Sequence, residues 1–205
     1  MFNYSSRILY SIRYELQSNE DTQRSFTGRR YLPVAMYINS NTFECDGACY
    51  SYSLPYDFEQ FHLNNLFQGG TFHKVRHLIM IERGPFEDKL FEYISRDFPF
   101  LEILEVSNVW PQESYQYSFT LMTFPYLKYL NLEYSHLCYT VQFLLKTSMH
   151  LPRLLYLSIP YQSLVFLTKN FTTDPSYFNF DTLKSLDLCE SFFRSENFHH
   201  YFPLL

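Results

Sequence analysis

Five segments of this sequence carry the same spacing of apolar residues, and this repetition limits the possible folds more than any other feature. Each segment opens on a large apolar residue and has further apolar residues three, six and eight positions later. The second of these positions recurs at Val75, Leu101, Leu127, Leu154 and Leu183, in steps of 26, 26, 27 and 29 residues. Because every position that the pattern defines is apolar, the spacing is an internal repeat.

The last part of each repeat, apolar-x-apolar, has the period of a strand that buries one face. The two earlier apolar positions, three residues apart, mark a turn that brings the chain back into the core. Pro99, Pro125 and Pro152 fall in these turns, where no ladder hydrogen bond is lost. One such strand cannot bury its inner face alone, so the strands are expected to stack into a parallel sheet around one core. The expected fold class is therefore α/β.

The segments that return from one strand to the next are predicted to be short helices or loops. Residues 86–94 and 140–149 have their apolar residues at helical spacing. Residues 111–122 and 164–178 are more ambiguous, and Pro175 would break a helix in the latter.

Strand residues that alternate with the buried ones point away from the core. In a stacked array they form the concave surface, where repeat proteins bind partners. Histidine, isoleucine and two tyrosines alternate with the core residues, a composition that interfaces favour, although a solvated sheet face is the alternative. The predicted partner-binding residues are Arg76, His77, Glu102, Ile103, Glu105, Lys128, Tyr129, Asn131, Tyr156, Ser158, Lys184 and Asp187.

The two ends of the sequence differ from its middle. Residues 1–70 do not follow the period and are predicted to be an irregular N-terminal segment, either a degenerate repeat or a cap, whereas residues 71–205 hold the five repeats. Within the first segment, residues 32–38 have the composition of a strand and could be an irregular earlier repeat. The chain closes at 202–205 on Phe-Pro-Leu-Leu, a signature like those that open the repeats. Because natural arrays usually finish in a polar capping repeat, we expect this array to be open or truncated there.

Charge and composition argue against several classes of partner. The net charge of −5 disfavours nucleic acid, since phosphate binding requires a basic face. The first residues lack the order of a signal peptide, and no apolar run is long enough to span a bilayer. We therefore expect an intracellular protein, cytoplasmic or nuclear, with reduced cysteines and no nucleic-acid or membrane partner.

No sequence pattern indicates catalysis, a cofactor or a metal site. Cys45 and Cys49 do not have the gap of a zinc knuckle, and no paired histidine motif follows them. His199 and His200 beside Glu196 are adjacent on one element and would rarely point to one metal. Phosphate loops, nucleophile elbows and paired-carboxylate motifs are lacking as well. The chain is therefore predicted not to be an enzyme and to need no cofactor.

The stretches Phe98-Pro99-Phe100-Leu101 and Phe124-Pro125-Tyr126-Leu127 resemble leucine-rich repeats, and the period falls in their 20–29 residue range. More narrowly, about residues 55–205 are similar to the repeat region of F-box-type leucine-rich-repeat proteins. The resemblance implies a solenoid with a parallel sheet on its concave side and short helices or loops on its convex side. It further implies the substrate-holding half of a ubiquitin-ligase receptor. An F-box, the helical module that docks on the ligase adaptor, is not found in this sequence.

The repeats depart from that family at the turn after each strand. Many family members carry an asparagine or cysteine three residues after the last strand leucine, where its side chain satisfies backbone groups. Arg83 and Val109 cannot do this in the same way, so irregular coils are expected after the first two strands. The residues at the five corresponding positions are Arg83, Val109, Ser135, Gln162 and Ser191.

Two interpretations of function remain. The first is a non-enzymatic scaffold that binds another protein on the concave sheet face, as the substrate-binding part of an F-box ubiquitin-ligase receptor. Such a receptor would reach the ligase adaptor through a domain not present here. The second is an incomplete or degenerate repeat fragment with no independent activity.

Overall fold

The computed structural model describes residues 5–11, 34–39, 46–53, 56–65, 67, 70–86, 88–112, 121–189 and 196–205, with only the backbone before residue 54. The chain divides into two compact units. The first comprises residues 1–58 with 66–68, and the second comprises residues 59–65 with 69–205.

The first unit contains a three-stranded antiparallel sheet. Its strands are β1 (Ser5–Ser11), β2 (Val34–Asn39) and β3 (Asp46–Ser53), with β3 between the other two. The strand predicted near residues 32–38 is confirmed as β2. The interpretation of this strand as an earlier repeat is wrong, because β2 pairs antiparallel with β3 and not with the parallel strands.

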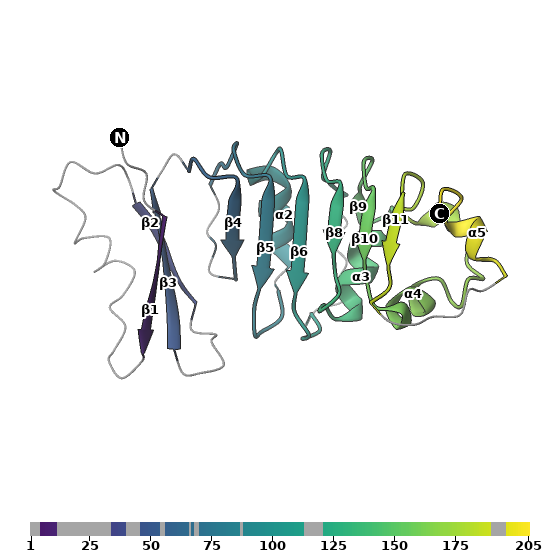
Figure 1. Ribbon diagram of the computed structural model, residues 1–205, viewed down its shortest axis with the longest axis horizontal. Coiled ribbons are helices and arrows are strands. Elements are labelled where there is room, and N and C mark those ends of the chain that lie inside the picture. Colours follow the sequence, from purple (N-terminus) through teal and green to yellow (C-terminus); the bar gives the residue numbers. More distant parts are fainter. Residues whose placement is uncertain are drawn as a thin grey trace. The chain divides into compact units, whose positions relative to one another are not determined.

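The second unit is built on a six-stranded sheet in which every neighbouring pair is parallel (Figure 1). The expected α/β class is thereby confirmed. Five of the strands coincide with the five repeats. The sixth strand lies before residue 71. Its Phe61 pairs with Leu78 of the next strand, only 17 residues later, so the regular repeat spacing did not reveal it. In spatial order the strands are β4 (Gln60–Leu63), β5 (His77–Ile81), β6 (Ile103–Ser107), β8 (Tyr129–Asn131), β10 (Tyr156–Ser158) and β11 (Ser185–Asp187).

Each repeat opens with the same hydrogen-bonded turn. The amide of the second pattern residue donates to the carbonyl of the first, three residues earlier, over 3.1 to 3.4 Å. The rings of Phe72 and Phe98 stack with their centroids 4.8 Å apart, which joins the first two turns. The same turn recurs near the C-terminus, where the Leu205 amide donates to the Phe202 carbonyl. The five opening residues, all buried, are Phe72, Phe98, Phe124, Leu151 and Phe180.

The strand leucines form one column across the sheet. The register pairs Leu78 with Leu104, Leu104 with Leu130, and Leu130 with Leu157. All four are between 0% and 2% exposed, so the column is the centre of the core. Leu186 continues it on the edge strand β11 and is half-buried, because β11 has no described strand on its other side.

The predicted helices exist, with shifted ends. α2 (Asp88–Asp97) buries Leu90, Phe91 and Ile94 on one face. α3 (Leu137–Leu144) begins earlier than predicted because the His136 ring accepts the Cys138 amide at its N-cap.

The helix predicted over residues 140–149 ends at Leu144. The chain becomes extended at Leu145, and Met149–His150 forms β9, which pairs in parallel with β7 (Met122–Thr123). Residues 113–120 lie outside the described part of the chain.

The last two returns carry short helices. α4 (Tyr161–Leu167) ends before three residues of positive φ, Lys169 to Phe171, that turn the chain. Pro175 starts the 3-10 helix η1 (Pro175–Tyr177), and α5 (Phe198–Tyr201) follows β11. No helix in the described ranges is long and apolar enough to cross a membrane.

Leu130→Ala should lower the free energy of unfolding by about 2–5 kcal/mol, because it leaves a cavity in the middle of the leucine column. Urea denaturation followed by circular dichroism measures this change. Leu204→Ala removes the same atoms from a side chain that is 58% exposed and should change stability by less than about 0.5 kcal/mol. Equal effects of the two substitutions would contradict a core at Leu130.

Candidate functional site

The predicted partner-binding residues lie in three rows across the sheet, on the face opposite its buried column. We call this exposed surface the outer face. In the second row, His77 pairs with Ile103, Ile103 with Tyr129, and Tyr129 with Tyr156. The third row runs through Glu105, Asn131, Ser158 and Asp187 by the same register.

The first row lies one residue ahead of the strands. The backbone ladder already joins its members, since the Glu102 amide donates to the Arg76 carbonyl and the Lys128 amide to the Glu102 carbonyl, both at 2.8 Å. The Lys184 amide donates to the carbonyl of Leu155 in the same way. The first-row residues therefore lie next to one another at the starts of adjacent strands.

Ser158 is the one predicted partner-binding residue that is buried. Its side chain is only 3% exposed, whereas the other eleven residues are half-buried or exposed. A serine side chain is shorter than those of Asn131 and Asp187 on either side, and its hydroxyl lies 3.4 Å from the Cys189 sulfur. The prediction that Ser158 is available to a partner is therefore wrong.

Strand β4 extends the outer face beyond the predicted set. Gln60 pairs with His77 and continues the second row, while His62 pairs with Ile79 in the third. Both side chains are exposed. Sequence reasoning missed them because residues 60–63 precede the first regular repeat, although the alternation of polar and apolar residues in Gln-Phe-His-Leu is a strand signal.

One side-chain hydrogen bond and one ion pair connect neighbouring strands on the outer face. His77 Nε2 lies 2.6 Å from Glu105 Oε1, and Lys128 Nζ lies 2.7 Å from Glu102 Oε2. All four side chains are between 27% and 42% exposed, so each pair contributes at most about 1 kcal/mol. Their main consequence is that these four side chains are held in defined positions.

Tyr129 lies in the most polar part of the face. Partial burial raises the pKa of its phenol above 10, and the negative charges of Glu105 and Asp187 raise it further. The phenol therefore keeps its proton at neutral pH and can donate a hydrogen bond. The neighbouring Tyr156 is 46% exposed.

The turn after β6 is more regular than predicted. Asn108, one residue before the expected position, is buried and supplies the missing polar group. Its Nδ2 donates to the Gly84 carbonyl at 2.7 Å and its Oδ1 accepts from the Trp110 amide at 2.9 Å. After β8, the Ser135 hydroxyl donates to the Leu132 carbonyl at 2.9 Å. The expectation of an irregular coil after β6, the strand of the second repeat, is therefore wrong.

The corresponding positions after the other three strands differ from one another. After β5, the Glu82 carboxylate accepts a hydrogen bond from the Arg83 amide at 2.9 Å, so an acidic side chain satisfies a backbone amide of this coil. Gln162 lies on α4 and is exposed. Ser191 lies outside the described residues.

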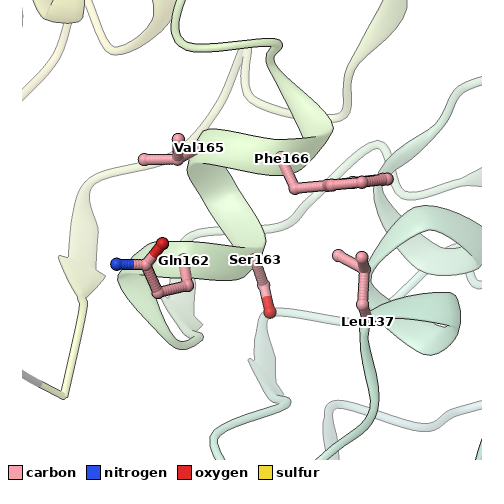
Figure 2. A pocket seen from close by; sticks show the side chains of 5 residues that line it. All are labelled: Leu137, Gln162, Ser163, Val165 and Phe166. Carbon is pink, nitrogen blue, oxygen red and sulfur yellow. The ribbon is translucent and has the colours of Figure 1, made fainter.

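A hollow of about 410 Å³ lies between α3 and α4. Figure 2 shows Leu137 from α3 and Phe166 from α4 on one side of it, with Ser163 near its centre. Val165 and Gln162 complete the lining, so its polar groups are one hydroxyl and one amide. This lining has apolar contact surface but no ionisable group for catalysis.

In the described part of the chain, no three His, Cys, Asp or Glu side chains lie close enough together to hold a metal ion. His199 and His200 are both exposed on α5. Cys45 lies outside the described residues, as does the side chain of Cys49.

Comparisons with protein-family models, with curated proteins and with solved structures find no match. The fold and the outer face define the chain as a mixed α/β protein with a parallel six-stranded sheet, one face of which is open. Its function is therefore inferred from this face and from the repeat spacing.

Glu105→Gln should lower the pKa of Tyr129 toward 10, because it removes a nearby negative charge. The pKa should stay above 10, since burial is the larger cause. NMR titration of the phenol carbon, assigned with Tyr129→Phe, measures it. Glu196→Gln, at an exposed position of the last segment, should leave this pKa unchanged. An equal response to both changes would show that Glu105 is not near the ring.

Proposed function

We propose that this chain is a leucine-rich-repeat solenoid that binds another protein on its outer face and catalyses no reaction. The repeat spacing of 26 to 29 residues supports the solenoid, as does a sheet whose strands pair in parallel in chain order. Each repeat contributes one strand and a return, which is how leucine-rich repeats build an extended binding surface.

The observation that carries the proposal is the second row of the outer face. Ile103, Tyr129 and Tyr156 stand side by side on adjacent strands and are half-buried or exposed. Tyrosine provides a large contact area and a hydroxyl donor for little loss of conformational entropy, which makes it a frequent anchor of interfaces. Because strands hold the three side chains, a partner would meet a preorganised surface.

The charged residues around this row suit a protein partner. They carry both signs, so they would set the orientation and rate of association more than its affinity. A surface of mixed charge with apolar residues at its centre matches the anatomy of a protein interface, a polar rim around an apolar core.

Within this proposal, the chain is the substrate-binding part of an F-box ubiquitin-ligase receptor. The resemblance of residues 55–205 to the repeat region of such receptors supports this role. The outer face would hold the substrate, and the ligase adaptor would bind a separate F-box module.

Affinity purification followed by quantitative mass spectrometry tests the proposal, with the chain and its Tyr129→Ala/Tyr156→Ala variant as baits. We expect specific proteins to be enriched on the chain and reduced several-fold on the variant, since tyrosine is enriched among the interface residues whose truncation costs more than about 1 kcal/mol. Enriched proteins that are known ligase substrates would support the receptor role.

Tyr177→Ala is the matched control, because Tyr177 is 56% exposed on η1, away from the sheet. It should leave the captured proteins unchanged. Thermal melts of all baits should agree within a few degrees, since the substituted tyrosines point outward. Capture that survives the double substitution would contradict binding at the outer face, and a collapse of thermal stability would place the tyrosines in the core.

A further inference from the structure

The first row of the outer face borders a second surface, made by the turns that open the strands. We call it the strand-start rim. In the turns of the first four repeats the residue before the core position is exposed, and in the second and third repeats it is aromatic, Phe100 and Tyr126. Their rings lie 5.5 Å apart, so the two turns present a continuous aromatic surface. Phe100 is 38% exposed and Tyr126 is 36% exposed.

Two arginines lie on these rings. The Arg76 guanidinium is 5.0 Å from the centre of the Phe100 ring, and the Arg153 guanidinium is 5.2 Å from that of Tyr126. Arg76 Nη1 also donates to the His73 carbonyl at 2.7 Å. A guanidinium that rests on a ring keeps donors along its edge, and these can bind a carboxylate in bidentate fashion.

The rim is cationic although the chain has a net charge of −5. Two of its acidic residues are already bound, Glu102 by Lys128 and Asp181 by Lys146. The opposite ends of the strands carry more acidic than basic residues. The basic residues of the rim are Lys74, Arg76, Lys128, Arg153 and Lys184, and its acidic residues are Glu59, Glu102 and Asp181. Among the described residues in or just beyond the opposite strand ends, the acidic ones are Glu82, Glu133 and Asp187, and the basic one is Arg83.

We propose that the strand-start rim binds an acidic, extended segment of the partner protein, with its carboxylates on Arg76 and Arg153 and apolar side chains on Phe100 and Tyr126. This inference rests on the proposed function and names the chemistry of the partner. The rim attracts an acidic segment because it is cationic. The rest of the chain is acidic and repels such a segment, so the rim is the surface on which it would bind.

The two guanidiniums limit the spacing of the carboxylates. The rings of Phe100 and Tyr126 are 5.5 Å apart, and the guanidiniums lie 5.0 and 5.2 Å from them, so the two guanidiniums are at most about 16 Å apart. An extended peptide rises about 3.3 Å per residue, so acidic residues no more than about four positions apart would reach both arginines.

A single-stranded nucleic acid is the other anion that binds basic and aromatic surfaces. The geometry disfavours it here. The rings of Phe100 and Tyr126 are tilted by 49° and each is in contact with a guanidinium, so a base cannot stack between them without displacing these contacts.

Fluorescence anisotropy tests the inference with three labelled probes. The first is a twelve-residue peptide with glutamate at every fourth position and leucine and serine between. The second replaces each glutamate with lysine, and the third is a twelve-nucleotide oligothymidine. We expect the whole chain to bind the glutamate peptide, to bind the other two at least tenfold more weakly, and to lose affinity as salt rises from 50 to 500 mM.

The double variant Arg76→Gln/Arg153→Gln should weaken binding of the glutamate peptide on the order of tenfold, as expected for two exposed charged contacts. Lys89→Gln/Lys169→Gln is its control, because it removes the same charge at exposed positions on α2 and after α4. It should change the affinity less than twofold. Thermal melts of both variants should match that of the chain.

Three results would overturn the inference: no binding of the glutamate peptide, tighter binding of the oligonucleotide, or an equal loss in both variants. None of these affects capture of a partner through Tyr129 and Tyr156. Failure of the rim and failure of the proposed function are therefore distinguishable.

Discussion

The buried column formed by Leu78, Leu104, Leu130 and Leu157 is the interaction on which the rest of the second unit depends. The strands of the six-stranded sheet are three to five residues long, too short to remain ordered without neighbours. Each leucine lies in register with the leucine of the next strand, and Leu186 on the edge strand is less buried than the other members of the column. Each strand is therefore stabilised by its neighbours, and the stability of the sheet is a sum over adjacent repeats.

The same stacking makes the outer face a regular surface. Inward burial of the leucines forces the alternate side chains outward, and the register then sets Tyr129 and Tyr156 side by side. Pairs that join strands, such as His77 with Glu105, then hold the charged side chains in place. A surface supported in this way suits recognition of a partner, because little conformational freedom remains to be lost on binding.

The candidate site could be predicted in part from spacing. Eleven of the twelve proposed residues are half-buried or exposed. The period of a strand places the second and third rows on one face, whereas the first row lies one residue ahead of the strands. The burial of Ser158 could not be predicted, because it depends on the longer side chains of neighbouring strands and on the sulfur of Cys189. Asn108 was likewise missed, since its role depends on the carbonyl of Gly84, which is 24 residues away.

The sequence by itself determined the repeat, the five regular strands, the direction of their side chains and the turns that open them. These features follow from local rules, because alternation of apolar residues and the spacing of three before a strand act over fewer than ten residues. Only the tertiary structure decided that β4 joins the sheet, that β2 pairs antiparallel, and that basic residues gather at one end of the strands with Arg76 and Arg153 on aromatic rings. Those features arise from contacts between residues far apart in the chain, and such contacts leave no period in the sequence.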